Sequence, residues 1–134
     1  MVDRRGTPLA FCLTGANTND SMVFEALLDA IPSVRQRRGR PRKRPDKLHA
    51  DKGYDFPKCR RALSRRRIKV RIARRGVEPS ERLGRHRWVV ERTLSWLSRF
   101  RRLRVRYERR LDIHDALVRL GCALITWGAV LRFC

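Results

Sequence analysis

The sequence predicts a mixed α/β domain, because strand-like and helix-like segments alternate along its 134 residues. Residues 7–14 and 68–72 alternate apolar with polar side chains, which is the pattern of half-buried strands. Residues 80–100 and 112–133 instead repeat apolar side chains at helical spacing. A chain of this length allows one domain.

The first predicted strand, residues 7–14, follows a turn at residues 4–6 that fits a hairpin. One face of this strand would carry Leu9, Phe11 and Leu13. Only three residues precede the turn. We therefore expect the chain to begin inside a sheet, so that the domain is partial and truncated at its N-terminus.

A short helix is predicted at residues 21–31, with Asp20 as its N-cap and Pro32 as its stop. Residues 33–46 follow as a basic loop rich in Arg, Pro and Gly. After Val34 this loop has no apolar residue before Leu48, so we expect it to become ordered only when it meets an anion.

The middle of the chain predicts a strand, a helix and a second strand in succession. The first strand covers residues 47–51 and ends in a turn at 51–55. A basic helix covers residues 57–67, and the second strand covers 68–72.

The long helix at residues 80–100 is expected to bury one apolar stripe, made of Leu83, Val90, Leu94 and Leu97. Residues 101–107 alternate Arg with apolar residues, which predicts an extended segment. A closing helix at residues 112–133 has its own apolar positions, which are Ala116, Leu120, Ala123, Leu124, Trp127 and Leu131.

The charge of the chain is strongly positive and uneven. Lys and Arg number 34 against 13 Asp and Glu, a net charge of +21, and residues 35–75 alone carry 19 cations and three acids. Self-repulsion at this density opposes a compact chain unless a polyanion neutralises it. Nucleic acid is the expected partner, because phosphates supply charge and paired acceptors for Arg. A GC-rich genome would explain Arg over Lys, but not the excess of bases over acids.

Several classes of protein are excluded by simple features. The N-terminus lacks the apolar core of a signal peptide, and no apolar run reaches the roughly 18 residues of a membrane span. The four cysteines form no C-x-x-C pair, which argues against a zinc site. We expect a cytoplasmic protein that does not engage a membrane.

Asp51 and Glu91 are the candidate carboxylates for chemistry. Asp51 ends a predicted strand and Glu91 lies on a later helix, and hard oxygen ligands of this kind hold Mg²⁺ for phosphoryl transfer. Structural alternatives remain open for both residues. Asp51 is also a common turn residue before Lys52 and Gly53, and Glu91 is placed to pair with Arg87 one helical turn earlier.

Two segments resemble the catalytic segments of bacterial insertion-sequence transposases of the DDE type. They are HADKGYD (residues 49–55) and RWVVERTLSWLSRFRRL (residues 87–103). The opening DRRGTPLA (3–10) and TGAN (14–17) with Asp20 are also similar to this family. The resemblance is closest to insertion sequence group five and covers nearly the whole chain.

The resemblance implies a ribonuclease-H-like mixed sheet flanked by helices. It also implies a site with two Mg²⁺ or Mn²⁺ ions, in which Asp51 is the second acidic ligand and Glu91 the third. No residue matches the first catalytic Asp, since Asp3 adjoins the turn. The residues expected to contact DNA lie within these two segments. They are Lys52, Tyr54, Arg87, Arg92 and Arg99. Gly84 and Ser98 stand where the family has Tyr and Lys, and Arg99 is the nearest replacement for that Lys.

The sequence is therefore interpreted as the C-terminal part of a DDE transposase catalytic domain. Such enzymes cut and rejoin DNA at the ends of a mobile element. With two of the three acids, the chain is expected to be inactive alone and to need an upstream reading-frame product or a homo-oligomer; a decayed remnant is an equal possibility. The alternative function is a basic, non-specific nucleic-acid-binding module without catalysis.

Overall fold

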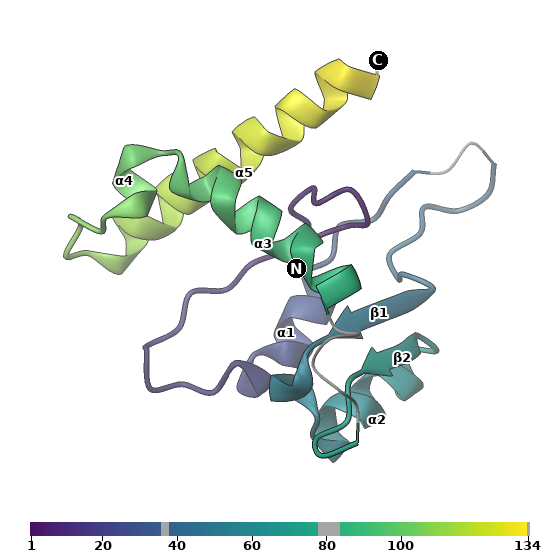
Figure 1. Cartoon of the computed structure of the whole chain (residues 1–134). Coiled ribbons are helices and arrows are strands. Elements are labelled where there is room, and N and C mark those ends of the chain that lie inside the picture. Colours follow the sequence, from purple (N-terminus) through teal and green to yellow (C-terminus); the bar gives the residue numbers. More distant parts are fainter. Residues whose placement is uncertain (36–37, 78–83, 134) are drawn as a thin grey trace. The chain divides into compact units, whose positions relative to one another are not determined.

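The computed structural model describes residues 1–35, 38–77 and 84–133, without the side chains of residues 84–87 and 133. The chain divides into two compact units (Figure 1). Unit 1 contains Met1–Leu9 and Trp88–Cys134, and unit 2 contains Ala10–Arg87.

A parallel pair of strands lies at the centre of unit 2. β1 (Lys47–Ala50) pairs with β2 (Lys69–Ile72) along the whole length of both strands. Parallel neighbours need a crossover connection, which the helix α2 (Pro57–Arg65) supplies. Before the sheet come a 3-10 turn, η1 (Asp20–Met22), and the short helix α1 (Phe24–Asp29).

The core of unit 2 is built from one face of α2 and from alternate strand positions. On α2, Cys59, Ala62 and Leu63 are almost completely buried. The spacing of these three residues places them on one side of the helix, and the other side carries the arginines. The other buried apolar side chains are Phe24, Leu28, Ile31, Leu48, Ile68, Ile72 and Ala73.

Ion pairs link α1 to the end of α2. The Glu25 carboxylate accepts a hydrogen bond from Arg65 Nη2 at 3.0 Å, and Asp29 accepts one from Arg66 Nη2 at 2.8 Å. The hydrogen bond that Arg66 donates to Asp29 raises the pKa of Arg66. These pairs are partly exposed, so each contributes only about 0–1 kcal/mol to stability.

Unit 1 is mainly helical. It contains most of α3 (Gly84–Ser98), then α4 (Arg101–Arg104) and the long α5 (Leu111–Phe133). Gly121 lets α5 approach its neighbours closely, because a Cβ there would lie 2.9 Å from Leu103 and 3.1 Å from Leu97. By length and composition alone, Leu111–Arg132 is also apolar enough to cross a membrane, a test that core helices pass too.

The structure confirms several predicted elements. The strand at residues 47–51 is β1, the helix at 57–67 is α2, and the strand at 68–72 is β2. The closing helix at 112–133 is α5. The sheet that the structure describes is the parallel pair alone, with isolated bridges at Val2–Pro8 and Val34–Arg42.

The strand predicted at residues 7–14 is wrong. A turn around Gly6, whose φ is +85°, leads only to the Val2–Pro8 bridge. The last backbone hydrogen bond of this turn runs from the Leu9 N–H to the Met1 carbonyl, and residues 10–15 have no regular structure. Alternation of apolar side chains does not by itself place a segment in a sheet.

Two local predictions are also wrong. Residues 101–104 form α4 rather than an extended segment, since a helical turn brings Leu103 against Gly121. The helix predicted from Asp20 is capped by Asn19, whose side chain accepts the Ser21 N–H at 2.9 Å. This segment is also interrupted between η1 and α1.

The apolar stripes predicted as buried in unit 1 are largely exposed. Val90 and Leu94 of α3 are exposed, and Thr93 between them is buried instead. Leu120, Leu124, Trp127 and Leu131 of α5 are exposed as well. Leu83 lies outside the described residues. Helical spacing identified the apolar faces correctly, but it does not say whether another element covers them.

Candidate functional site

Asp51 follows the last residue of β1 and begins the 3-10 turn η2 (Lys52–Tyr54). Its Oδ1 accepts the Gly53 N–H at 2.9 Å, so the aspartate caps this turn. The structural alternative for Asp51 is therefore present in the molecule. The cap does not exclude a metal-binding role. It uses Oδ1 of an exposed side chain, and a carboxylate oxygen that is used by a cap still leaves Oδ2 for a metal ion.

Tyr54 packs behind this turn. Its ring lies 5.4 Å from that of Phe24, and burial raises the pKa of its hydroxyl to about 12. The nearby Asp20 and Asp51 carboxylates act in the same direction. The Tyr54 hydroxyl therefore stays protonated at neutral pH. The ring is half-buried and packs against Phe24. Its DNA-contacting role remains a prediction.

Asp55 anchors the same turn, although the sequence analysis did not select it as a site residue. Its Oδ1 accepts two hydrogen bonds from the Arg60 guanidinium, at 2.7 and 2.9 Å, and its Oδ2 accepts the Arg75 N–H at 2.9 Å. The Arg75 N–H first, and then Arg60, lower the pKa of Asp55. The Arg75 guanidinium also donates to the Lys52 carbonyl at 3.0 Å.

These contacts fix the backbone that carries Asp51. Arg60 also donates to the Ile72 carbonyl at the end of β2, at 3.0 Å. The Asp51 turn is thus held to α2 and to the segment after β2 by charged hydrogen bonds. A detectable sign in the sequence was the acid four residues after Asp51, in a region where acids are scarce.

Glu91 lies on α3 with an exposed side chain. It belongs to unit 1 and Asp51 to unit 2. Among the described residues, no cluster of three His, Cys, Asp or Glu side chains could hold a metal ion. Arg87, predicted to contact DNA and named as the pairing partner of Glu91, has its backbone in α3, and its side chain lies outside the described residues.

Arg92, the residue after Glu91, is held between two indole rings. Its guanidinium carbon lies 4.4 Å from the Trp88 ring centroid and 4.9 Å from that of Trp96. Its Nη2 donates to the Arg5 carbonyl at 2.6 Å. Such cation–π stacking favours Arg, whose flat guanidinium lies against ring faces. These contacts give Arg92 a structural role within unit 1. That Arg92 also contacts DNA remains a prediction.

Thr93 also bonds to the N-terminal turn at residues 4–6 that Arg92 contacts. Its hydroxyl is buried and donates to the Gly6 carbonyl at 2.7 Å. Gly6 has a positive φ, and a Cβ there would lie 3.0 Å from the Thr93 hydroxyl oxygen. Arg92 and Thr93 therefore fix the N-terminal turn to α3 beside Glu91. Helical periodicity missed this pair because both residues are polar.

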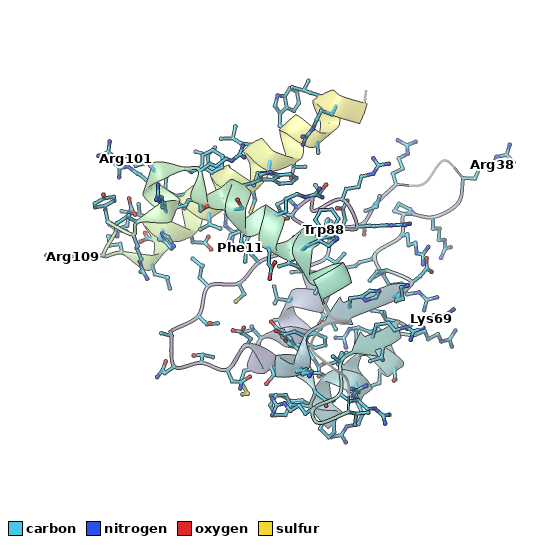
Figure 2. All side chains as sticks on the ribbon, viewed as in Figure 1. Phe11, Arg38, Lys69, Trp88, Arg101 and Arg109 are labelled. Carbon is cyan, nitrogen blue, oxygen red and sulfur yellow. The ribbon has the colours of Figure 1, made fainter. Side chains whose placement is uncertain are left out.

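The remaining predicted contacts are at the surface. Arg99 is exposed in the turn that follows α3, and Lys52 is half-buried in η2. In Figure 2, Arg101 and Arg109 point outward from unit 1, and Lys69 points outward from the sheet of unit 2. Exposed cations thus occur in both units, as backbone contacts to nucleic acid require.

Comparison with known proteins identifies similar sequences. The family model described as the transposase DDE domain matches residues 1–126. A Burkholderia cepacia protein named as a transposase for insertion sequence element IS402 is 53% identical over 132 residues. This match covers 98% of the chain but 63% of the relative, so the chain spans less than two thirds of that protein. No solved structure matches the chain.

Proposed function

Since this chain belongs to the transposase DDE domain family, we propose that it supplies Asp51 and Glu91 as two acidic metal ligands of a ribonuclease-H-like catalytic domain. The complete enzyme would cut DNA at the ends of an insertion sequence and join the freed 3′-hydroxyl to target DNA. One observation carries the proposal. Within the matched region, Asp51 directly follows β1, a strand of the parallel pair whose Leu48 is buried in the core of unit 2.

The chemistry of the donor set fits a divalent metal. DDE transposases generally use divalent metals, and exposed carboxylates are suitable ligands for Mg²⁺ and Mn²⁺. Asp51 and Glu91 would hold the ions, which supply Lewis acidity at the reacting phosphate. The contacts of Asp55 with Arg60 and Arg75 would keep the Asp51 turn rigid during this reaction.

DNA binding is proposed to depend on the basic surfaces of both units. Lys52, Arg87 and Arg99 would contact phosphates near the two carboxylates, with Tyr54 beside them. Contacts of this kind position a duplex without reading its sequence. DNA binding should therefore weaken steeply as salt rises.

These 134 residues are proposed to bind DNA and to supply two of the three acids, because none of them matches the family's first catalytic Asp. Cutting would need the third acid as well. A hybrid protein provides the test. This chain replaces the matched stretch of the Burkholderia cepacia relative, and nicking of element-end DNA is measured with Mg²⁺ or Mn²⁺.

The decisive variants are Asp51→Asn and Glu91→Gln in that hybrid. Each should abolish metal-dependent nicking while leaving DNA affinity unchanged or slightly higher, because a negative charge is removed. Asp46→Asn is the matched control, since Asp46 is an exposed acid just before β1. If the two variants nick DNA as well as the control does, the alternative of a basic DNA-binding module without catalysis is favoured.

A further inference from the structure

The segment between α3 and α5 carries a dense group of arginines with one exposed aromatic ring among them. Residues 99–110 contain seven arginines and one acid, Glu108. Tyr107 is 62% exposed, in the irregular stretch that follows α4. An exposed tyrosine ring among cations offers a face on which a flat group of an anionic ligand can stack.

The one acid of this segment does not offset the arginines at the surface. The Glu108 side chain is only 5% exposed, and its Oε1 accepts a hydrogen bond from Arg102 Nη1 at 2.9 Å. This hydrogen bond lowers the pKa of Glu108, so the carboxylate is ionised and already bound at neutral pH. The Glu108 carbonyl also accepts a hydrogen bond from Arg106 Nε at 3.1 Å. The segment therefore folds around its acid and leaves cations on its outer side.

Three other arginines of the segment are available to a ligand. Arg101, Arg104 and Arg109 are exposed, and their side chains make no hydrogen bond or ion pair with the residues that the structure describes. Arg101 and Arg109 point outward in Figure 2. Free guanidinium groups suit phosphates, which accept two parallel hydrogen bonds from one arginine.

The tyrosine ring and two of the arginines line the same depression in the surface of unit 1. It has a volume of about 430 Å³, and its lining residues are Arg101, Arg102 and Tyr107. The depression is open to solvent, so a strand could lie across it. A base can reach such a ring only when it has left the stack of a duplex. The combination of ring and cations therefore favours single-stranded over double-stranded DNA.

We propose that this arginine–tyrosine surface (Arg101, Arg102 and Tyr107) binds single-stranded DNA, with one base stacked on the Tyr107 ring and a neighbouring phosphate on Arg101. The inference rests on the proposed function for its ligand, since an enzyme that cuts DNA meets unpaired strand ends. It adds the form of DNA that this part of unit 1 binds. Stacking of this kind tolerates any sequence, because every base has a flat aromatic face.

The first experiment measures binding of the full chain to a fluorescent oligothymidine and to a duplex of equal length by anisotropy. Tyr107→Leu should weaken binding of the single strand about 5- to 100-fold and leave duplex binding within about twofold. Tyr107→Trp should keep the affinity, because an aromatic ring remains. Trp127→Leu is the matched control, since Trp127 is 61% exposed but lies on α5, which carries as many acids as arginines.

Three results of this experiment would overturn the proposal. They are a parent chain that does not bind the single strand, equal losses in Tyr107→Leu and Trp127→Leu, and equal losses for single strand and duplex. A Tyr107→Trp variant as weak as Tyr107→Leu would also contradict stacking.

The second experiment tests the phosphate contact through its salt dependence. In Arg101→Gln, the slope of log affinity against log salt should fall by about 0.7 for the single strand, the value of one phosphate contact. Arg119→Gln is the control, since Arg119 is an exposed cation of α5 that pairs with Asp115. An unchanged slope in Arg101→Gln, or the same change in both variants, would contradict the contact.

Neither experiment involves a metal ion or cleavage, so the two proposals fail separately. Nicking by the hybrid protein together with unaltered single-strand binding in Tyr107→Leu would refute the arginine–tyrosine surface alone. Binding that depends on Tyr107, in a chain whose hybrid does not nick DNA, would refute only the catalytic role of Asp51 and Glu91.

Discussion

The two units of this chain treat their apolar side chains differently. In unit 2, α1, α2 and the β1–β2 pair bury Phe24, Leu28 and Leu63 almost completely. In unit 1, α3 and α5 leave Leu94, Leu124 and Trp127 about half exposed or more. The apolar pattern of the sequence does not distinguish the two units, since helices in both have apolar residues at helical spacing.

This difference follows from the contacts that each unit makes within itself. Unit 2 contains a sheet, a crossover helix and ion pairs that link α1 to the end of α2. Unit 1 has polar and aromatic contacts at the Gly6 turn and a close approach at Gly121, with exposed apolar faces left over. Unit 2 therefore covers its apolar side chains by internal packing, whereas unit 1 leaves part of its own apolar surface exposed.

The largest expected effect is in the core of unit 2. Leu63→Ala should lower the free energy of unfolding by about 2–5 kcal/mol, because Leu63 is completely buried and its removal leaves a cavity. Denaturant unfolding monitored by circular dichroism measures this loss. Leu124→Ala in unit 1 should change this free energy by no more than about 0.5 kcal/mol, because Leu124 is about half exposed. Equal losses would remove the contrast between the units.

A smaller loss in the free energy of unfolding is expected at the buried contact between Thr93 and the turn around Gly6. Thr93→Val keeps the shape of the side chain but leaves the Gly6 carbonyl without its hydroxyl donor. The expected cost is about 1–3 kcal/mol in the free energy of unfolding. Ser98→Ala is the control, since the exposed Ser98 hydroxyl donates to the Ser95 carbonyl three residues earlier in the same helix. Hydrogen exchange at residues 3–9 should rise in the Thr93 variant alone.

The pH dependence of unit 2 should depend on Asp55. Its pKa is lower in the folded chain than the unfolded value of about 4. Its stabilising contribution is therefore complete above pH 4 and is lost as pH falls through the folded pKa. Thermal unfolding between pH 6 and pH 2 should show a weaker acid dependence in Asp55→Asn. An unchanged pH profile would contradict the anchoring role of its bonds with Arg60 and Arg75.

The smallest effect is expected for the ion pairs between α1 and α2. Glu25→Gln should cost at most about 1 kcal/mol, because its pairs with Arg65 and Arg66 are partly exposed. The loss should shrink when unfolding is repeated in 0.5 M NaCl, since salt screens exposed charges. A loss that is large and independent of salt would show that these pairs, rather than burial, support unit 2.

Much of unit 2 was predictable from the sequence. The alternation at residues 68–72 and the turn after residue 50 gave both strands nearly to their observed ends, because local side-chain pattern decides them. Asp51 at the end of β1 followed from the same pattern. The predicted strand at 7–14 is wrong because the pairing of strands in a sheet depends on distant parts of the chain, which a local pattern does not contain.

The candidate site was less predictable than the fold around it. The family resemblance selected Asp51 and Glu91, but periodicity could not reveal that Arg92 is stacked between Trp88 and Trp96. Nor could it reveal the bonds of Asp55, which depend on Arg75, 20 residues away in the sequence. Such contacts are set by tertiary packing.

The central proposal is that Asp51 and Glu91 hold the same metal ions in the complete enzyme. The most direct measurement replaces Mg²⁺ by Fe²⁺ in the hybrid protein and maps where metal-generated radicals cut the polypeptide. We predict cuts near residues 51 and 91 together, which excess Mg²⁺ suppresses and Asp51→Asn removes at both positions. Cuts at neither position, or cuts near residue 91 that persist in Asp51→Asn, would contradict a shared metal site.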